Sequence, residues 1–536
     1  MQSSFFAIHL SVFSLLGLTG LLWPWTWWLL LLPVLTLLVG LHDMYQPRHT
    51  LLRNFPLIGR GRWIMESLRP FVRQYLVESD LDGTPISRMF RSIVYQRAKG
   101  VMDSLPYGTR LDTYTEGYEW ISHSIAALNI ATLDANPRVV IGSAQCKRPY
   151  SSSILNISAM SFGALSNNAV LALNKGAKLG GFSHNTGEGA ISDYHLQHGG
   201  DLVWQIGTGY FGCRKTDGSF DPDSFKKKAG AEQVKMIEIK LSQGAKPGHG
   251  GILPAGKNTA EIARIRLVEP HQDVISPSAH SAFSTPVELL EFVEQLRDLS
   301  GGKPVGIKLC VGRQSEFIAI CKAMIKTAIK PDFITVDGGE GGTGAAPLEY
   351  SNSLGMPLRD AIAFVDDCLT GFGIRQEIRI IASGKIFSAF HMMRAMALGA
   401  DLCNSGRGMM LALGCVQSLV CNTNRCPTGV ATQDKRLVRG LDVTDKGNRV
   451  ARYHKETLRA AVDMASSCGL TNPGLITRSH VFRRVDHQHA LRFDQLYPSP
   501  KPGSLLTKPY PQQFERYLEE ASEDSFIPRQ FLCDSC

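Results

Sequence analysis

Three cysteines in the second half of the chain have the residue type and spacing of an iron–sulfur ligand set. Cys415, Cys421 and Cys426 fall within twelve residues, and Pro427 follows the third. A structural zinc site uses four ligands in two close pairs, and no second cysteine pair or histidine couplet lies near this run. A [4Fe–4S] cluster takes four cysteines, so three thiols fit a cluster that lacks one iron. The alternative is three ordinary buried cysteines on a helix and a loop.

The rest of the composition is that of a globular enzyme. Of the 536 residues, 44% are hydrophobic and 20% are charged, and twelve cysteines are too few for a disulfide scaffold. The 51 glycines gather in short runs after apolar stretches, which favours close backbone approach to a ligand over linker flexibility. The net charge is +9, but no aromatic–basic pattern indicates a nucleic-acid partner. The terminal pair of Cys533 and Cys536 is interpreted as incidental.

The elements that must hold these residues alternate between strands and helices from about residue 151 to 408. Amphipathic stretches such as Ala169–Lys178 and Pro286–Leu296 separate short apolar runs. Such alternation predicts an α/β fold, and the length suits a (β/α)8 barrel of the TIM type. The predicted strands are Ile154–Ser158, Phe182–His184, Val203–Ile206, Met236–Leu241, Val274–Pro277, Val305–Cys310, Phe333–Val336, Ile378–Ala382 and Asp401–Asn404.

Nine candidate strands exceed the eight of a barrel, so one must be an accessory strand. Val203–Ile206 and Val274–Pro277 are the two suspects. A doubly wound open sheet is the alternative fold, but no GxGxxG sequence follows a first strand. Lys308, inside Val305–Cys310, would either point into the barrel mouth or lie buried against a carboxylate.

Two uncharged apolar runs at the N-terminus predict a transmembrane helical hairpin. They extend from Phe5 to Leu22 and from Trp25 to Leu41, and a span needs roughly 17–20 such residues. Pro24 interrupts them among four tryptophans, which suit the headgroup level. A cleaved signal peptide fits poorly, because no basic region precedes the apolar stretch. One bent or re-entrant segment is the other alternative.

Four arginines follow the second run: Arg48, Arg53, Arg60 and Arg62. By the positive-inside rule, they predict an inner (cytoplasmic) membrane protein whose catalytic domain faces the cytoplasm. Between residues 43 and 110, 11 Lys/Arg stand against 6 Asp/Glu, which favours a basic surface beside anionic membrane lipid. We expect two transmembrane helices in 1–42, a basic juxtamembrane connector in 43–110, the barrel with its Fe–S loop in 111–435, and C-terminal helices and a tail in 436–536.

Five runs resemble, in the same order, motifs of the FMN-binding glutamate synthase family. Four of them are Ser158–Gly163, Asn185–Gly189, Lys240–Gly248 and Asp337–Ala345, and the fifth is the cysteine run with Gly429–Gln433. Five ordered matches over about half of the chain are far more specific than one glycine loop. The resemblance implies a membrane-anchored relative of the large-subunit synthase domain. It also implies bound FMN and a [3Fe–4S] cluster held by Cys415, Cys421 and Cys426.

Other glycine runs make physical sense for the FMN that the resemblance implies. A phosphate needs several inward N–H groups, and in many barrels it lies at the loops after the last two strands. Tight turns are the alternative interpretation of these loops. Lys308 would stabilise the reduced flavin near N1 and O2, and the Ala159–Met160 backbone would lie near N5. The implied cofactor-binding residues are Ala159, Met160, Lys308, Gly338, Gly339, Ser383, Gly384, Lys385, Gly406 and Arg407.

The resemblance also implies a site for a dicarboxylate such as 2-oxoglutarate or glutamate. Lys246 and Arg266 would hold its carboxylates, the first as a point charge and the second as a planar fork. Glu188 would lie beside the substrate, position ammonia and accept a proton. Ser284 is the fourth residue carried over. Surface salt bridges for the two cations and a turn role for Glu188 are the alternatives.

The chain departs from the family pattern at several positions. Ile252 stands where Gln is common, Ala190 replaces a glycine, and Ser383–Lys385 replaces an acidic–glycine pair. The natural substrate is therefore expected to differ from plain 2-oxoglutarate, and the FMN contacts to differ in detail. Gln2 stands where an amidotransferase domain would have its cysteine, so we expect either that glutamine is hydrolysed elsewhere or that the nitrogen donor is ammonia or an amine.

Three functions are compatible with these residues. The first is reductive amination of 2-oxoglutarate or a related keto acid, with electrons from ferredoxin or a membrane carrier. The second is FMN-dependent oxidation of an amino or 2-hydroxy acid, or N-methylglutamate-type synthesis, coupled to membrane carriers. The third is a non-enzymatic, anchored electron-transfer subunit. We expect the first, an oxidoreductase that acts on CH–NH2 donors.

Overall fold

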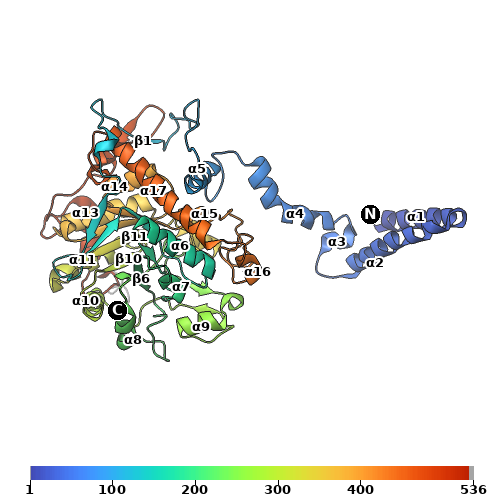
Figure 1. Ribbon diagram of the computed structural model, residues 1–536, viewed down its shortest axis with the longest axis horizontal. Coiled ribbons are helices and arrows are strands. Elements are labelled where there is room, and N and C mark those ends of the chain that lie inside the picture. Colours follow the sequence, from blue (N-terminus) through green and yellow to red (C-terminus); the bar gives the residue numbers. More distant parts are fainter. Residues whose placement is uncertain (1, 530–536) are drawn as a thin grey trace. The chain divides into compact units, whose positions relative to one another are not determined.

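In the computed structural model, which describes residues 2–529, eight parallel strands close into a barrel (Figure 1). The predicted (β/α)8 fold is therefore confirmed. β13 pairs with β4 and closes the wall. In chain order the barrel strands are β4 (Leu155–Ile157), β5 (His184–Asn185), β6 (Leu202–Ile206), β7 (Val234–Lys240), β10 (Val305–Leu309), β11 (Phe333–Asp337), β12 (Arg379–Ser383) and β13 (Leu402–Ser405).

Short apolar sequences form these strands because both faces of a barrel wall are buried. Every residue of β6, β10 and β11 is buried. One buried carboxylate of the barrel strands is surrounded by hydrogen-bond donors. Glu238 of β7 accepts hydrogen bonds from Asn185 at 2.8 Å, Gln205 at 2.6 Å and Thr335 at 2.6 Å. A buried carboxylate with this many donors is tolerated in an otherwise apolar core.

Helices connect successive strands and surround the barrel (Figure 1). Ser166 begins the first of them by accepting the N–H of Ala169 at 3.2 Å, and Gly181 ends it with φ 66°. The predicted helices at Ala169–Lys178 and Pro286–Leu296 are confirmed. The helices of the barrel are α6 (Asn167–Gly180), α7 (Asp193–Leu196), α8 (Pro222–Ala229), α10 (Pro286–Leu299), α11 (Gln314–Thr327), α12 (Leu348–Ser353), α13 (Leu358–Gly371), α14 (Ala389–Ala397), α15 (Arg407–Ala412), α16 (Lys435–Val438) and α17 (Val443–Ser467).

A long excursion separates β7 from β10, and we call residues 241–304 the β7–β10 excursion. It contains β8 (Ile252–Leu253), β9 (Val274–Ile275) and α9 (Ala260–Arg266). β9 pairs antiparallel with β8 outside the barrel and is the accessory strand. Val203–Ile206, the other suspect, belongs to barrel strand β6, in which every residue is buried, as expected for a wall covered on both faces.

The long helix α17 packs along α6. Val450 lies against Gly176, and the ring of His454 stacks on Phe182 with centroids 3.9 Å apart. Two strands among the C-terminal residues, where the sequence predicted only helices and a tail, form a sheet with β1. The remaining α-helices and strands after residue 87 are α5 (Arg88–Lys99), β1 (Glu119–Ile121), β2 (Arg138–Ile141), β3 (Tyr150–Ser153), β14 (Val481–Arg484), β15 (Ala490–Arg492), α18 (Phe493–Leu496) and α19 (Gln512–Glu520). Cys533 and Cys536 lie outside the described residues.

The N-terminal unit, Met1–Arg88, is separate from the unit Met89–Cys536. Its helices α1 (Gln2–Leu22) and α2 (Leu31–Tyr45) form a hairpin, in which His9 Nε2 lies 3.0 Å from Thr36 Oγ1. The segments Gln2–Leu22 and Pro24–Tyr45 have mean hydropathies of 2.0 and 1.7 and are long enough to cross a membrane. Next come α3 (Thr50–Asn54), α4 (Arg60–Val72) and the π-helical turn Arg73–Val77.

Candidate active site

A buried ion pair lies at the carboxyl end of the barrel strands. Lys240 is the last residue of β7, and Glu188 lies in the loop after β5. Lys240 Nζ is 2.7 Å from Glu188 Oε1, and Ser276 Oγ donates to Glu188 Oε2 at 3.4 Å. This end of a TIM barrel is where the active sites of barrel enzymes lie. Lys240 begins the motif Lys240–Gly248, but the sequence did not indicate that it pairs with Glu188.

Two further cations of the β7–β10 excursion are buried beside this pair. Lys246 is 2% exposed and Arg266 is 5% exposed. Arg266 Nη2 donates to the carbonyl of Phe162 at 3.1 Å, and the guanidinium lies over the ring of Phe211, 5.3 Å from its centroid. Within residues 2–529, Arg266 Nε has no hydrogen-bond partner, and no carboxylate lies within ion-pair distance of Lys246 or Arg266.

The electrostatics of this cluster favour an anion. Burial raises the pKa of Glu188, but Lys240, Arg266 and Lys246 together outweigh burial and hold that pKa below its ordinary value. Burial lowers the pKa of Lys246, and the neighbouring Lys240 lowers it further. Burial also lowers the pKa of Arg266 to about 10. Three cations therefore face one ionised carboxylate, and two positive charges remain without a partner.

Lys308 forms a second buried pair on the neighbouring strands. It is 6% exposed, and its Nζ lies 3.3 Å from Asp337 Oδ2 at the end of β11. Asp337 also accepts hydrogen bonds from Ser383 Oγ at 2.8 Å and from the N–H of Gly244 at 2.9 Å. Burial lowers the pKa of Lys308, but Asp337 and then Glu238 raise it more, so its pKa is raised. Lys308 is thus paired with a carboxylate at the strand ends.

The loops after β12 and β13, the last two barrel strands, present free backbone N–H groups. Those of Gly384, Lys385, Gly406 and Arg407 have no acceptor in the part of the chain that the structure describes. Gly384 and Lys385 have φ 144° and 50°, and a Cβ on Gly406 would meet nothing nearer than 3.5 Å. The Arg407 side chain donates to the carbonyl of Thr343. Unpaired N–H groups at this place fit a phosphate.

The other predicted cofactor-binding residues lie around the same end of the barrel. Gly338 and Gly339 follow β11, but their N–H groups are already bonded to the carbonyls of Ser383 and Met356 at 2.8 and 2.9 Å. They instead allow a close approach of two loops, since a Cβ on Gly244 would lie 1.8 Å from the oxygen of Gly338. Ala159 and Met160 lie in the loop after β4. Their roles toward a flavin stay predictions.

Ser284 is not brought into the cluster around Glu188. It is exposed, and its hydroxyl and N–H bind Glu288 Oε2 at 2.9 and 2.6 Å. Thr285 and Glu288 form the capping box that begins α10. The described contacts of Ser284 therefore stabilise the start of a helix rather than contact an anion site.

The three predicted cluster ligands lie in one loop after α15. Cys426 is 4% exposed, and Cys415 and Cys421 are half-buried. Burial raises the pKa of Cys426, but hydrogen bonds from Thr428 and from the backbone N–H groups that follow outweigh burial, so this pKa is lowered. Burial raises the pKa of Cys415. Backbone N–H groups aimed at a sulfur favour its thiolate form, which is the form that binds iron.

The spacing of these thiols excludes a single-ion site. Among residues 2–529, no three His, Cys, Asp or Glu side chains are close enough to hold one metal ion. The thiolates of an iron–sulfur cluster bind different irons, so they need not converge on one point. The three sulfurs therefore fit a cluster by donor type, and the cluster stays a prediction.

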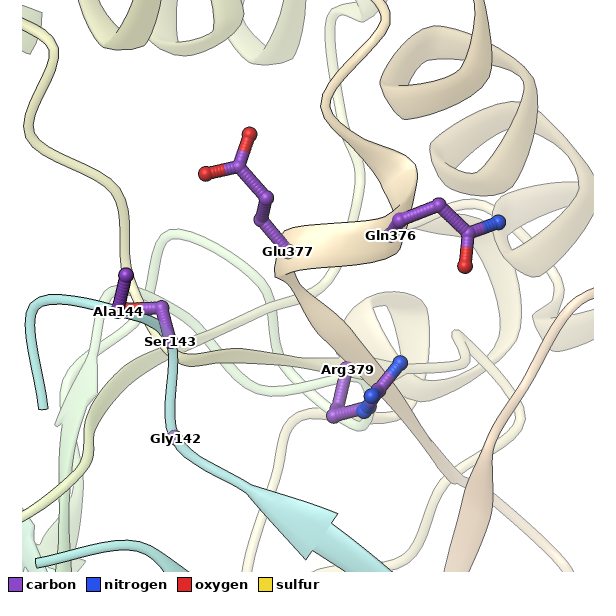
Figure 2. A pocket seen from close by; sticks show the side chains of 6 residues that line it. All are labelled: Gly142, Ser143, Ala144, Gln376, Glu377 and Arg379. Carbon is purple, nitrogen blue, oxygen red and sulfur yellow. The ribbon is translucent and has the colours of Figure 1, made fainter.

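A pocket at the opposite end of the barrel offers no comparable chemistry (Figure 2). It lies beside Arg379, the first residue of β12, and thus at the amino ends of the strands. The side chains of Gln376, Glu377 and Arg379 point in different directions there. Glu377 is already paired with Lys330 at 2.7 Å. The charged groups that converge are those at the carboxyl end.

Buried cations and free N–H groups at the carboxyl end of a (β/α)8 barrel are typical of barrel enzymes that bind anionic small molecules. Residues 102–471 match the conserved region in glutamate synthase. The chain belongs to this family, as the five motifs indicated, and is therefore an oxidoreductase rather than a non-catalytic carrier.

Individual relatives agree with this assignment. The glutamate synthase large subunit-like protein YerD of Bacillus subtilis (strain 168) is 37% identical over 85% of this chain and 94% of its own length. An archaeal glutamate synthase (NADPH) of Methanocaldococcus jannaschii is 36% identical, but the match covers only 59% of each chain. A solved structure of mandelate oxidase with (S)-4-hydroxymandelic acid overlaps 74% of this chain and 99% of its own, at 12% identity and a TM-score of 0.44. The last similarity is too low to bear on function.

Proposed function

We propose that this chain uses FMN to convert a dicarboxylic 2-oxo acid, 2-oxoglutarate or a relative, and ammonia or an amine into the amino acid. The observation that supports this is the pair of buried cations, Lys246 and Arg266, that lack a carboxylate partner beside Glu188 within residues 2–529. A dianion neutralises both cations. A monoanion leaves one charge buried and unpaired, which is unfavourable.

Each residue of the cluster has a defined task in this reaction. Arg266 holds one carboxylate through its unpartnered Nε side, and Lys246 holds the other as a point charge. Glu188, kept ionised by Lys240, takes a proton from the nitrogen as the carbon–nitrogen bond forms and the oxo oxygen leaves as water. FMN, when bound and reduced, would supply the hydride needed to reduce the carbon–nitrogen double bond.

The cofactors are part of the proposal. The free N–H groups of Gly384, Lys385, Gly406 and Arg407 would hold the FMN phosphate, and the three cysteines would hold a [3Fe–4S] cluster. Absorbance and low-temperature EPR spectra of anaerobically purified protein test both at once. We expect flavin bands and the signal of an oxidised three-iron cluster. A colourless preparation without iron contradicts this proposal.

The reaction itself is tested under anaerobic conditions. Photoreduced protein is mixed with 2-oxoglutarate and ammonium, and we expect the flavin to reoxidise as glutamate forms. A monocarboxylic 2-oxo acid of similar size should react far more slowly. If the flavin stays reduced with every keto acid and amine tried, reductive amination is wrong. Reduction of the oxidised flavin by amino or 2-hydroxy acids would then favour the oxidase alternative.

The substrate need not be plain 2-oxoglutarate, because Ile252 stands where the family pattern has Gln. Ile252 pairs with Ile275 in the β8–β9 hairpin, next to Gly251 and Ser276. Ser276 in turn contacts Glu188. A panel of substituted dicarboxylic keto acids and amines, ranked by the rate of flavin reoxidation, identifies the preferred pair. Glutamine in place of ammonium tests the nitrogen donor in the same assay.

We also propose that the N-terminal hairpin anchors the enzyme in the inner membrane, with the catalytic unit in the cytoplasm. The hydropathy of Gln2–Leu22 and Pro24–Tyr45 and the arginines after α2 support this. Ferredoxin or a membrane carrier would then donate electrons, whereas the archaeal relative is named for NADPH. A Leu16→Arg/Leu35→Arg variant should leave the membrane fraction. Retention of that variant in washed membranes would contradict the anchor.

A further inference from the structure

A buried lysine joins three segments next to the cysteine run. Lys257 is 3% exposed and ends the short 3₁₀ turn Ala255–Lys257 of the β7–β10 excursion. Its Nζ donates to the carbonyl of Ala164 at 2.8 Å and to the carbonyl of Cys421 at 3.1 Å. Ala164 lies in the loop after β4, and Cys421 lies in the cysteine run. One ammonium group therefore ties the cysteine run to two loops at the carboxyl end of the barrel.

Neutral side chains tie the same segments together. Asn424 Nδ2 donates to the carbonyl of Gly256 at 3.2 Å. Gln433 Nε2 donates to the carbonyls of Gly163 and Leu165 at 3.0 and 2.9 Å. Amide groups thus make the same kind of contact between these loops. Lys257 differs from them in its positive charge.

The charge of Lys257 has no carboxylate to balance it. No Asp or Glu in the described range 2–529 lies within ion-pair distance of its Nζ. The ionisable groups that act on it are the thiols of Cys421 and Cys426 and the guanidinium of Arg266. A buried ammonium is unfavourable unless an anion compensates it. The thiolates of the cysteine run are the anions in reach.

We propose that Lys257 is a positioning residue that fixes the cysteine run and compensates the negative charge of the iron–sulfur cluster bound there. This inference rests on the proposed function, since it requires that the three cysteines hold the cluster. Reduction adds one electron to an already anionic group. A fixed cation beside it stabilises the reduced form more than the oxidised form, and so raises the reduction potential of the cluster.

Three substitutions at Lys257 separate its charge from its hydrogen bonds. Lys257→Gln keeps N–H donors without the charge, Lys257→Met removes both, and Lys257→Arg keeps both. Lys303→Met is the matched control. Lys303 is also buried, donates to the carbonyls of Ala229 and Ala231 at 2.5 and 2.9 Å, and precedes β10 at the amino end of the barrel.

The readouts are an EPR-monitored redox titration of the full-length protein and hydrogen exchange of residues 415–433. We expect the cluster potential to fall in Lys257→Gln, to return toward wild type in Lys257→Arg, and to stay unchanged in Lys303→Met. Lys257→Met should also exchange faster in residues 415–433, including in protein stripped of iron. If Lys257→Met does not fold, the reduction potentials of Lys257→Gln and Lys257→Arg still show whether the charge of Lys257 matters.

Two negative outcomes are distinguishable. A wild-type protein without an EPR-active cluster overturns the proposed cofactor and this inference together. A Lys257→Gln protein with a full cluster signal and the potential of the wild type overturns only the role of Lys257.

Discussion

Replacement of Arg266 by methionine should weaken dicarboxylate binding without destabilising the fold. Methionine fills similar space but carries no charge. In the ligand-free protein, Arg266 makes one hydrogen bond to Phe162 at 3.1 Å and has no carboxylate partner within residues 2–529. Removal of a buried, unpaired charge also removes the cost of its desolvation. We expect the free energy of unfolding to stay within about 1 kcal/mol of wild type or to rise.

The loss should instead appear in the affinity for the substrate. Hydrogen bonds between charged groups contribute about 1.5–3 kcal/mol each, so a two-point contact of Arg266 with a carboxylate is worth about 3–6 kcal/mol. That range corresponds to a Kd for 2-oxoglutarate that is about 150- to 25,000-fold weaker. Anaerobic calorimetric titration of the purified protein measures this Kd, and urea denaturation measures the stability.

Arg297→Met is the matched control, because Arg297 is equally buried but paired. Its Nη2 lies 3.2 Å from Asp332 Oδ2, and the side chain of Asp332 is completely buried. Loss of this partner leaves an uncompensated carboxylate, which should cost about 3–5 kcal/mol of stability while the Kd of the folded protein stays unchanged. If Arg266→Met loses as much stability as Arg297→Met, Arg266 is structural. An unchanged Kd in Arg266→Met would refute its role as a carboxylate ligand.

Three further changes test other parts of the site. Gly244→Ala should lower the free energy of unfolding, measured by urea denaturation, by at least about 2 kcal/mol, because the new Cβ lies 1.8 Å from the oxygen of Gly338. Gly312→Ala is the control: its Cβ meets nothing within 4 Å, so its free energy of unfolding should change little. Glu188→Gln should make the free energy of unfolding fall less steeply at acid pH. The folded-state pKa of Glu188 lies below its ordinary 4.5, so the stabilisation that Glu188 provides is complete above pH 4.5 and is lost as the pH falls through the folded-state pKa. Parallel pH profiles of wild type and Glu188→Gln would contradict this. Ser284→Ala should leave the Kd for 2-oxoglutarate unchanged, because its hydroxyl is engaged at the start of α10; a clear rise in that Kd would show a substrate contact.

The barrel could be predicted because its wall has one simple requirement. Strands buried on both faces need short, mostly apolar runs, and the eight barrel strands overlap eight of the nine runs. The ninth, Val274–Ile275, has the same composition but pairs in a hairpin. Composition cannot tell these cases apart, because pairing depends on where the chain returns. β14 and β15 were missed because Val481–Arg484 and Ala490–Arg492 are short and rich in arginine.

The site was predictable only as far as its motifs reach. The family resemblance identified Glu188, Lys246 and Arg266, and the structure brings these three together. It gave no role to Lys257 or to Lys240, although Lys240 begins the motif Lys240–Gly248. Which of several lysines faces a given carboxylate or thiol depends on how the β7–β10 excursion folds back over the strand ends. Spacing along the chain does not encode that geometry.

The charged residues of the β7–β10 excursion and the loops with free N–H groups lie in different parts of the sequence. Lys246, Lys257, Arg266 and Ser276 all belong to this single contiguous segment, whereas the free N–H groups come from loops more than seventy residues farther along the chain. A recombination event that replaces only this segment exchanges Lys246, Lys257 and Arg266 but leaves Glu188 and Lys240 in place. The barrel wall and the loops after β12 and β13 are left untouched. Proteins that descend from one barrel can therefore differ in the charged groups of this segment while the barrel strands and the loops after β12 and β13 stay the same.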